Sequence, residues 1–245
     1  MKNNPYRFLG IGLIIAGAIF APVAYLVINS VPITAIALSS IMIGFTSFAL
    51  ATARPRISPE AGQMMLETWM ANISAFLEEL GINKKAIYLP STMRTGDAQV
   101  LIPLGGEINV QKIQRKIPGR LIVRYGDNPD DVAITFTAPG STSLNMLEMK
   151  PGPTSSEIEQ TLTYVLTGLL DIANSVSVHL SDKLLHIKVT GSKLHYENVW
   201  YYRCIGSPIA SIVATIASDS LGKPIRIKEE NYHKGVSTIQ LEVLS

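Results

Sequence analysis

The chain has 245 residues, of which 47% are hydrophobic and only 16% are charged, whereas charged residues usually make up roughly a quarter of a soluble domain. Its formal net charge of +2 at pH 7 gives no indication of a globally basic surface for nucleic acid. The single cysteine excludes an internal disulfide and a cysteine-rich zinc site.

The shortage of charge is concentrated near the N-terminus. Residues 8–53 contain no Asp, Glu, Lys, Arg or His, and a polar turn at 29–32 divides them. The runs 8–28 and 33–53 each match the roughly 20 residues that a helix needs to cross a hydrocarbon core about 30 Å thick. A helix also satisfies its own backbone polar groups in lipid. We therefore expect a two-helix transmembrane hairpin within residues 1–57.

The basic residues beside this hairpin indicate its orientation. Lys2 and Arg7 precede the first run, Arg54 and Arg56 follow the second, and the connecting turn has none. The positive-inside rule then predicts a cell-membrane protein with both termini in the cytoplasm. Three alternatives remain open, and one of them is a hairpin in the core of a soluble protein. A cleaved signal peptide would have a shorter apolar core and no second run, and an inverted topology would place the glycosylation sequon at 72–74 outside the cell.

Small residues recur at four-residue spacing in both runs. Gly12 with Ala16, and Ser40 with Gly44, would let the two helices approach closely. Such packing is common, so it does not by itself indicate an oligomer interface.

Residues 60–80 are predicted to form an amphipathic helix that ends at Gly81. Large apolar residues recur in it at spacings of three and four, a pattern that normally faces a core. We expect this stripe to be buried. It consists of Met64, Met65, Leu66, Trp69, Ile73, Phe76, Leu77 and Leu80.

Alternating β-rich segments follow this helix. Segments 86–89 and 98–104 are predicted to form one hairpin, and 121–125 with 132–137 a second. Between them, 108–117 has the spacing of a short helix that ends at Pro118-Gly119. Together these elements define a first α+β subdomain over residues 58–140.

Prolines and glycines, which interrupt regular secondary structure, indicate that residues 141–154 are a linker with one short helix. A second subdomain, 155–245, then repeats the pattern. Ser155 or Ser156 is expected to cap a helix that runs to Ala173. The remaining elements are a hairpin of 175–180 and 184–190, a helix from Ser207-Pro208 to Leu221-Gly222, and strands at 225–230 and 238–244.

The fold class is therefore α+β, with helices covering one face of antiparallel sheets. A helix followed by a hairpin occurs four times, at 60–104, 108–137, 155–190 and 207–244. This order suggests two similar halves. Residue-level identity between the halves is not evident, so coincidence remains an alternative explanation.

The strongest local candidate for a ligand site lies just before the Ser207 helix. A helix N-terminus presents unpaired amide donors and a partial positive charge, which attract an anion or lower the pKa of a thiol. The alternative is structural, with aromatic side chains in a seam, a capping serine and a buried cysteine. The candidate residues are His195, Trp200, Tyr202, Arg203, Cys204, Gly206 and Ser207.

A second candidate is a basic patch with no acidic residue between Glu107 and Asp127. On a tethered domain such a patch can contact anionic lipid head groups. Nucleic acid is a less favoured partner because no aromatic stacking platform accompanies the charges, and a solvated face is the third interpretation. The patch consists of Lys112, Arg115, Lys116, Arg120 and Arg124.

Enzyme and metal signatures are absent from the sequence. His179 and His186 are too few for a metal site without a third ligand, and no phosphate-binding glycine motif or local triad occurs. We therefore predict no metal or cofactor. Whether the chain is an enzyme stays open, and the sequence favours a protein that is not one.

Two short segments suggest a family resemblance. The helix start at 206–211 and the helix end at 221–224, combined with a two-span hairpin and a proline-marked exit, resemble uncharacterised archaeal two-span membrane proteins with a cytosolic α+β domain. The resemblance implies the same architecture here and carries no catalytic residue with it.

Our leading hypothesis is a membrane-anchored, cytosol-facing scaffold or interaction protein. Its partners would be the lipid bilayer and either another protein or a second copy of the chain. The alternative is a membrane-tethered enzyme or a binder of a small anionic ligand at the Ser207 helix start near Cys204. A channel is a third possibility, but the spans lack the ionisable residues that mark a conducting path.

Overall fold

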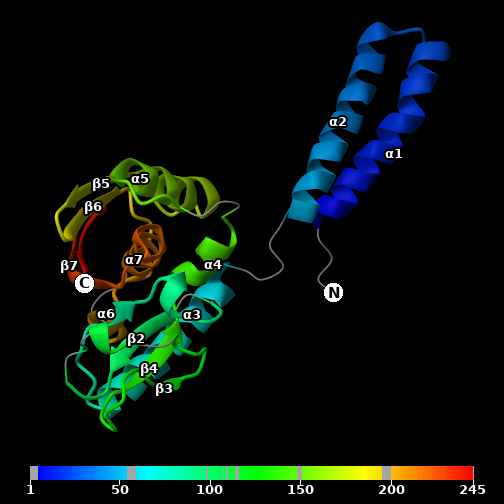
Figure 1. Cartoon of the computed structure of the whole chain (residues 1–245). Helices are drawn as coiled ribbons and strands as arrows, with labels where there is room; N and C mark the ends of the chain where they lie inside the picture. Colours follow the sequence, from blue (N-terminus) through cyan, green and yellow to red (C-terminus); the bar gives the residue numbers. More distant parts are fainter. Residues whose placement is uncertain are drawn as a thin grey trace. The chain divides into compact units, whose positions relative to one another are not determined.

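The computed structural model describes residues 5–53, 59–97, 99–106, 108, 110–113, 116–147, 151–194 and 200–244. The chain divides into two compact units, Met1–Leu66 and Glu67–Ser245. Each unit is described separately below. Figure 1 traces the elements of both.

The first unit contains the predicted hairpin, formed by α1 (Pro5–Leu26) and α2 (Val31–Ala53). Both helices begin a few residues before the predicted apolar runs. Most of their large apolar side chains point outward, and only 17% of each candidate span is buried. The structure thus confirms two N-terminal helices that are long and apolar enough to cross a membrane.

Close packing in the hairpin depends on small residues seven positions apart. Gly10, Gly17 and Ala24 are buried on α1, as are Ala37 and Gly44 on α2. A Cβ added at Gly10 would lie 2.8 Å from the Gly44 carbonyl oxygen. The predicted contribution of Gly12 and Ala16 is wrong, because both are exposed and Gly12 has no neighbour within 4 Å. Gly44 does lie in the interface.

The second unit is built on one eight-stranded antiparallel sheet with the order β3-β4-β2-β1-β7-β8-β6-β5. Both predicted hairpins of the first subdomain are present and contribute its first four strands. These are β1 (Ile87–Tyr88), β2 (Gln99–Pro103), β3 (Ile122–Arg124) and β4 (Val132–Thr137).

The second subdomain contributes the other four strands of the same sheet. Its two hairpins were also predicted correctly. In each of them at least one strand extends further toward the turn than expected. The strands are β5 (Ser175–Ser181), β6 (Leu184–Thr190), β7 (Ile225–His233) and β8 (Val236–Val243). The two groups of strands meet only where β1 pairs with β7, through Ile87 with Arg226 and Tyr88 with Ile225.

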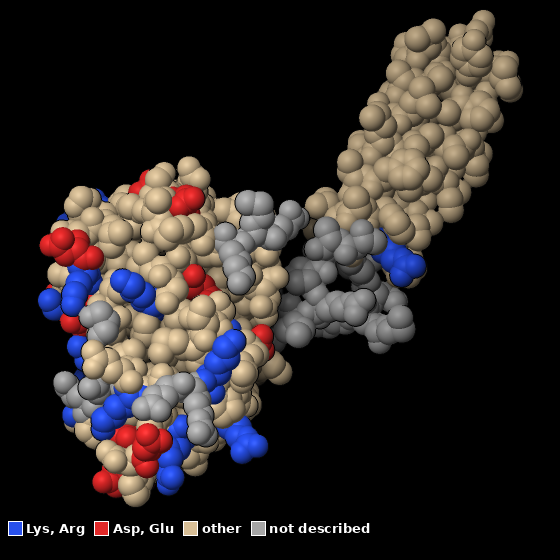
Figure 2. Space-filling view, viewed as in Figure 1, with Lys and Arg blue, Asp and Glu red and all other residues tan. Residues whose placement is uncertain are grey.

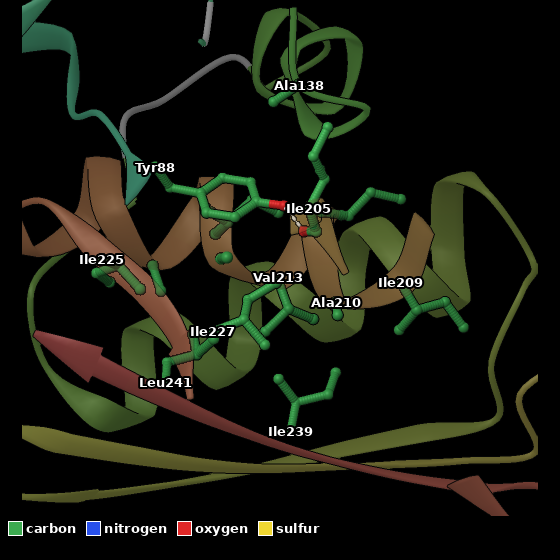
Figure 3. Close-up of a cluster of buried hydrophobic side chains, with 14 of the residues drawn as sticks. Tyr88, Ala138, Ile205, Ile209, Ala210, Val213, Ile225, Ile227, Ile239 and Leu241 are labelled. Atoms are coloured by element: carbon green, nitrogen blue, oxygen red, sulfur yellow. Dashed lines mark hydrogen bonds between the residues drawn. The ribbon is translucent and has the colours of Figure 1, made fainter. Parts of the chain in front are cut away.

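The main core lies between one face of this sheet and the helices. Its central element is α7 (Pro208–Leu221), almost all of which is buried. Figure 3 shows Ile209, Ala210 and Val213 of this helix facing Ile239 and Leu241 of β8. Helix α5 (Ser155–Thr163) continues as a π-helical segment, Tyr164–Leu169, and packs on the same face.

The boundaries of α5 and α7 follow from their caps. Ser207 caps α7 as predicted, and Gly222 ends it with φ +62°. The predicted cap of α5 is wrong by one residue, because Thr154 and Glu157 form a reciprocal capping box before Ser155. The hydrogen bonds from Thr154 lower the pKa of the Glu157 carboxyl.

The opposite face of the sheet is covered in its first half only. A smaller apolar cluster forms there around Ile87, Leu101 and Ile117, beneath the segment between β2 and β3. The predicted helix at 108–117 is wrong. Of the described residues in that range, only Val110–Lys112 form a helical turn, of the 3-10 type. The apolar residues there cover the sheet and do not form a helix stripe.

Helix α3 (Pro59–Glu79) confirms the predicted helix but not the burial of its whole stripe. Leu77 is fully buried and Met70 is 8% exposed. Most of the other predicted stripe residues face outward, with exposed fractions of 44–67%. They are Met64, Met65, Leu66, Trp69, Phe76 and Leu80. The remaining described helices are α4 (Gly140–Asn145) in the predicted linker and α6 (Trp200–Ile205).

Candidate functional site

At the N-terminus of α7, acceptor groups of the protein itself bind the amides of Ser207 and Ala210. The Ser207 hydroxyl accepts a hydrogen bond from the Ala210 amide at 3.2 Å. The Glu230 carboxylate of β7 accepts the Ser207 amide at 3.0 Å and also the Ser207 hydroxyl. A carboxylate from the same chain therefore occupies the position that the sequence offered to an external anion.

Cys204 lies in the main core and lacks the features of an activated thiol. It is 3% exposed, its Sγ lies 3.5 Å from the Ile82 carbonyl oxygen, and burial raises its pKa. A reactive cysteine needs the opposite, a lowered pKa with access to solvent. The surroundings of Cys204 therefore favour a structural role.

The aromatic residues around Cys204 also make internal contacts. The Trp200 indole donates a hydrogen bond to the Ile82 carbonyl at 2.8 Å, and the Arg203 guanidinium lies 5.3 Å from the centre of the Trp200 ring. The Tyr202 hydroxyl lies 3.5 Å from the Met70 sulfur.

Gly206 has φ +91°, a backbone conformation that favours glycine, and an added Cβ would lie 2.4 Å from the Cδ1 atom of Ile227. His195 lies outside the described residues. The structure thus brings the other six predicted residues into one region, where their polar groups bind the protein itself.

Beneath this region, Tyr88 ties β1 to the second half of the domain. Its hydroxyl donates a hydrogen bond to the Ile205 carbonyl (Figure 3), and burial raises its pKa. The Ser218 hydroxyl donates to the Tyr88 carbonyl at 3.0 Å. The contacts explain why an aromatic residue with a polar tip is buried at this junction.

The predicted basic patch is only partly assembled. Lys112, Lys116 and Arg124 line one pocket of about 320 Å³ together with Asp127. The Lys112 ammonium pairs at 3.2 Å with Asp131, whose side chain is 9% exposed. Arg120 does not line this pocket, and Arg115 lies outside the described residues. The charge of the pocket is therefore partly neutralised by the protein's own carboxylates.

A larger groove, which the sequence did not reveal, lies at the junction of β1 and β7. Its volume is about 470 Å³. Ile87, Pro103 and Leu244 provide apolar surface. Four basic residues also line the groove, and Glu242 is the one carboxylate among its described lining residues. The basic residues are Lys84, Lys85, Arg226 and Lys228. We call this site the seam groove.

Two structural details shape the seam groove. The Arg226 guanidinium binds Glu242 at 2.8 Å and 3.1 Å, so none of the described lining residues offers the three lysines a second carboxylate. Lys228 is the extra residue at a β-bulge between Ile227 and Glu229, and its carbonyl accepts the Lys85 ammonium. Bulges often redirect side chains beside functional sites.

The face of the molecule drawn in Figure 2 carries charges of both signs. In Figure 2, blue and red side chains are interspersed over the domain, and the hairpin is uncoloured except at one end. Among the described residues, no group of three or more His, Cys, Asp or Glu side chains is arranged to hold a metal ion.

Comparison with known proteins gives one match. The model of a family described as a domain of unknown function, DUF7982, matches residues 1–242. The chain belongs to this family. No curated protein and no solved structure matches it. The DUF7982 match covers the hairpin and the domain together.

Proposed function

We propose that the chain is a membrane-anchored, cytosol-facing interaction protein, and that its seam groove binds an acidic segment of a partner protein. The groove carries this proposal because four basic side chains and several apolar residues line it together. Such a surface suits an extended segment with several carboxylates and one apolar anchor. The hairpin keeps the domain at the membrane, where the positive-inside rule favours the cytoplasmic side.

Other parts of the domain are less suited to this role. The open edge of the sheet at β5 is blocked near its middle, because the Val178 amide donates to Glu159 at 2.7 Å and the Val178 carbonyl accepts from Ser155 at 2.9 Å. Pairing with a partner strand is therefore disfavoured there. The Ser207 helix start already holds Glu230, which weighs against the small-anion alternative.

The order of strands supports two similar halves as part of the same proposal. Counting strands along the chain within each half, both halves read third, fourth, second, first across the sheet, as β3-β4-β2-β1 and β7-β8-β6-β5. The halves differ in their second helix, since α7 has only the turn 110–112 as its counterpart. The seam groove would then lie at the joint between two related units.

Site-specific photo-crosslinking of the full chain in its native membrane tests the groove. A photoreactive residue replaces Lys84 at the groove, or Lys234 in the exposed β7–β8 turn as a matched control. We expect an adduct of defined mass only from position 84. The further substitution Lys228→Glu should weaken it about tenfold or more, while Lys234→Glu leaves it unchanged.

Three outcomes would contradict the proposal. Adducts that form equally from both positions, or from neither, would show that the groove does not bind a partner protein. Binding of inorganic pyrophosphate at millimolar concentration, without any protein adduct from position 84, would assign the groove to a small anion.

A further inference from the structure

Helix α3 carries a second apolar face that the domain does not cover. Trp69, Phe76 and Leu80 are 67%, 44% and 50% exposed. On a helix of 3.6 residues per turn they share one side. The buried face, formed by Met70, Ser74 and Leu77, lies about a quarter turn away from it. In the part of the chain that the structure describes, one face of α3 thus meets the core, and an adjacent apolar face does not.

Chain connectivity determines what is available to meet the exposed face. The second span ends at Ala53, and α3 begins at Pro59. The five intervening residues reach at most about 20 Å. The start of α3 therefore stays within that distance of the end of a membrane span, whatever else the protein does.

The chemistry of α3 matches the interfacial layer of a bilayer. Trp is the residue type most typical of membrane interfaces, because its apolar ring also carries a polar N–H group. Glu78 lies nine residues after Trp69, which places it two and a half turns further along and on the opposite side of the helix. With the stripe against lipid, that carboxylate would point toward water.

We propose that α3 lies flat on the membrane and inserts Trp69, Phe76 and Leu80 into the lipid interface, so that the domain has a fixed face toward the bilayer. Helices of this kind bury their apolar side about 5–10 Å into the boundary between head groups and acyl chains. Since α3 has no Lys, Arg or His, insertion depends on apolar contact and not on anionic lipid. The inference does not depend on the seam groove.

Tryptophan quenching by brominated lipid tests this contact. The chain contains two tryptophans, Trp69 and Trp200, so Trp200→Phe leaves the indole at position 69 as the sole reporter. The full chain is reconstituted into vesicles of zwitterionic phosphatidylcholine brominated near the head-group end of the acyl chains. We expect strong quenching and a blue-shifted emission from this indole.

A matched variant controls for distance from the anchor. Combining Trp200→Phe with Trp69→Phe and Ala71→Trp moves the indole to an exposed position on the other side of the same helix. We expect little quenching from that position. Hydrogen exchange of the β6–β8 amides, measured in each variant, verifies that the domain remains folded.

Three results would overturn the inference. Equal quenching from both positions would mean that α3 has no fixed orientation, and absence of quenching from both would mean that it does not touch lipid. Loss of an oligomer on Phe76→Glu, with no quenching of the position 69 indole, would assign the stripe to a second copy of the chain.

Discussion

Two parts of the molecule have nearly the same sequence character and opposite surroundings. Tyr6–Leu26 and Val31–Ala51 are apolar helices long enough to cross a membrane, and so is the segment Trp200–Leu221. Yet only 17% of each N-terminal span is buried inside the protein, against 78% of the third segment. Length and apolar composition therefore do not distinguish a lipid-facing helix from the central helix of a domain.

The break between α6 and α7 and the contacts of one hydroxyl do distinguish them. The third segment is broken at Gly206 and Ser207, where φ +91° and a serine cap separate α6 from α7. Its Ser218 hydroxyl donates to the carbonyls of Tyr88 and Lys223, outside its own helix, although its Thr215 hydroxyl bonds the Ser211 carbonyl four residues earlier. In α2 the hydroxyls of Thr34, Ser39 and Ser40 all return to carbonyls four residues earlier. A helix that crosses a membrane finds no hydrogen-bond partners in the lipid itself.

The largest effect should come from placing a charge in the buried helix. Val213→Asp puts an unpaired carboxylate at a position that is 0% exposed, and we expect it to cost more than about 4 kcal/mol and unfold the domain. Protease digestion of the membrane-inserted chain would show loss of the resistant domain fragment while the hairpin stays protected. In the matched control, Ile19→Ser on the outward side of α1 should leave that fragment intact. If the domain of the Val213→Asp variant stayed intact, α7 would not be part of the core.

The next effect concerns the charge that α7 carries near its end. Asp219 pairs at 2.7 Å with Arg94, and their side chains are 11% and 7% exposed. Arg94 also donates to the Leu89 carbonyl at 3.1 Å and to the Gly96 carbonyl at 2.6 Å. Arg94→Ala would leave the buried Asp219 carboxylate with the Ser91 amide but without its charged partner. We expect a loss of about 3–5 kcal/mol in the free energy of unfolding.

Thermal and denaturant unfolding of the full chain in detergent would measure this loss. The exposed pair Lys193–Asp171 has the same 2.7 Å separation and serves as the control. Lys193→Ala should cost about 0–1 kcal/mol. If both substitutions lowered the free energy of unfolding equally, burial would not increase the contribution of the Arg94–Asp219 pair to stability.

Helices and strands whose ends are set by capping or turn residues nearby in the sequence could be predicted. The Ser207-Pro208 start and Gly222 end of α7 are local signals, and so is the turn at Lys234-Gly235 between β7 and β8. The predicted helix at 108–117 failed because its apolar spacing also suits a segment that covers a sheet. Periodicity alone does not separate these two structures.

The candidate site was harder to predict, because its decisive contacts join distant segments. Glu230 follows Ser207 by 23 positions, and nothing in the sequence pairs them. The seam groove joins residues 83–87 to 226–228 and 242–244, beside the two-residue strand β1. Pairing of so short a strand has no sequence signature, although the excess of Lys and Arg at 83–87 and 226–228 was visible.

The hairpin itself offers the third prediction. Gly10→Leu would force a side chain against the Gly44 carbonyl and the Phe48 amide, which lie 2.8 Å and 2.9 Å from an added Cβ. We expect the association of α1 with α2 to weaken by about 1–3 kcal/mol. Energy transfer between labels at positions 6 and 51, followed during titration with denaturing detergent, would report the change. Gly12→Leu is the control and should be neutral, because nothing lies within 4 Å of that position.

The smallest effect on stability should come from the Cys204 thiol, which lies within the third apolar segment. Burial raises its pKa above the ordinary value of 9.0. Because the folded-state pKa is the higher one, the thiol's contribution to stability is complete below about pH 9 and declines as the pH rises further.

Maleimide labelling of Cys204 in the folded chain should be slow. Its rate should still increase above pH 9, where the labelling rate of the denatured chain levels off. Cys204 is the chain's one cysteine, so all thiol labelling comes from it. The variant Cys204→Ser measures the background labelling. Labelling of the folded chain as fast as the denatured chain would mean that this segment is not enclosed by the domain, and the contrast with the N-terminal spans would fail.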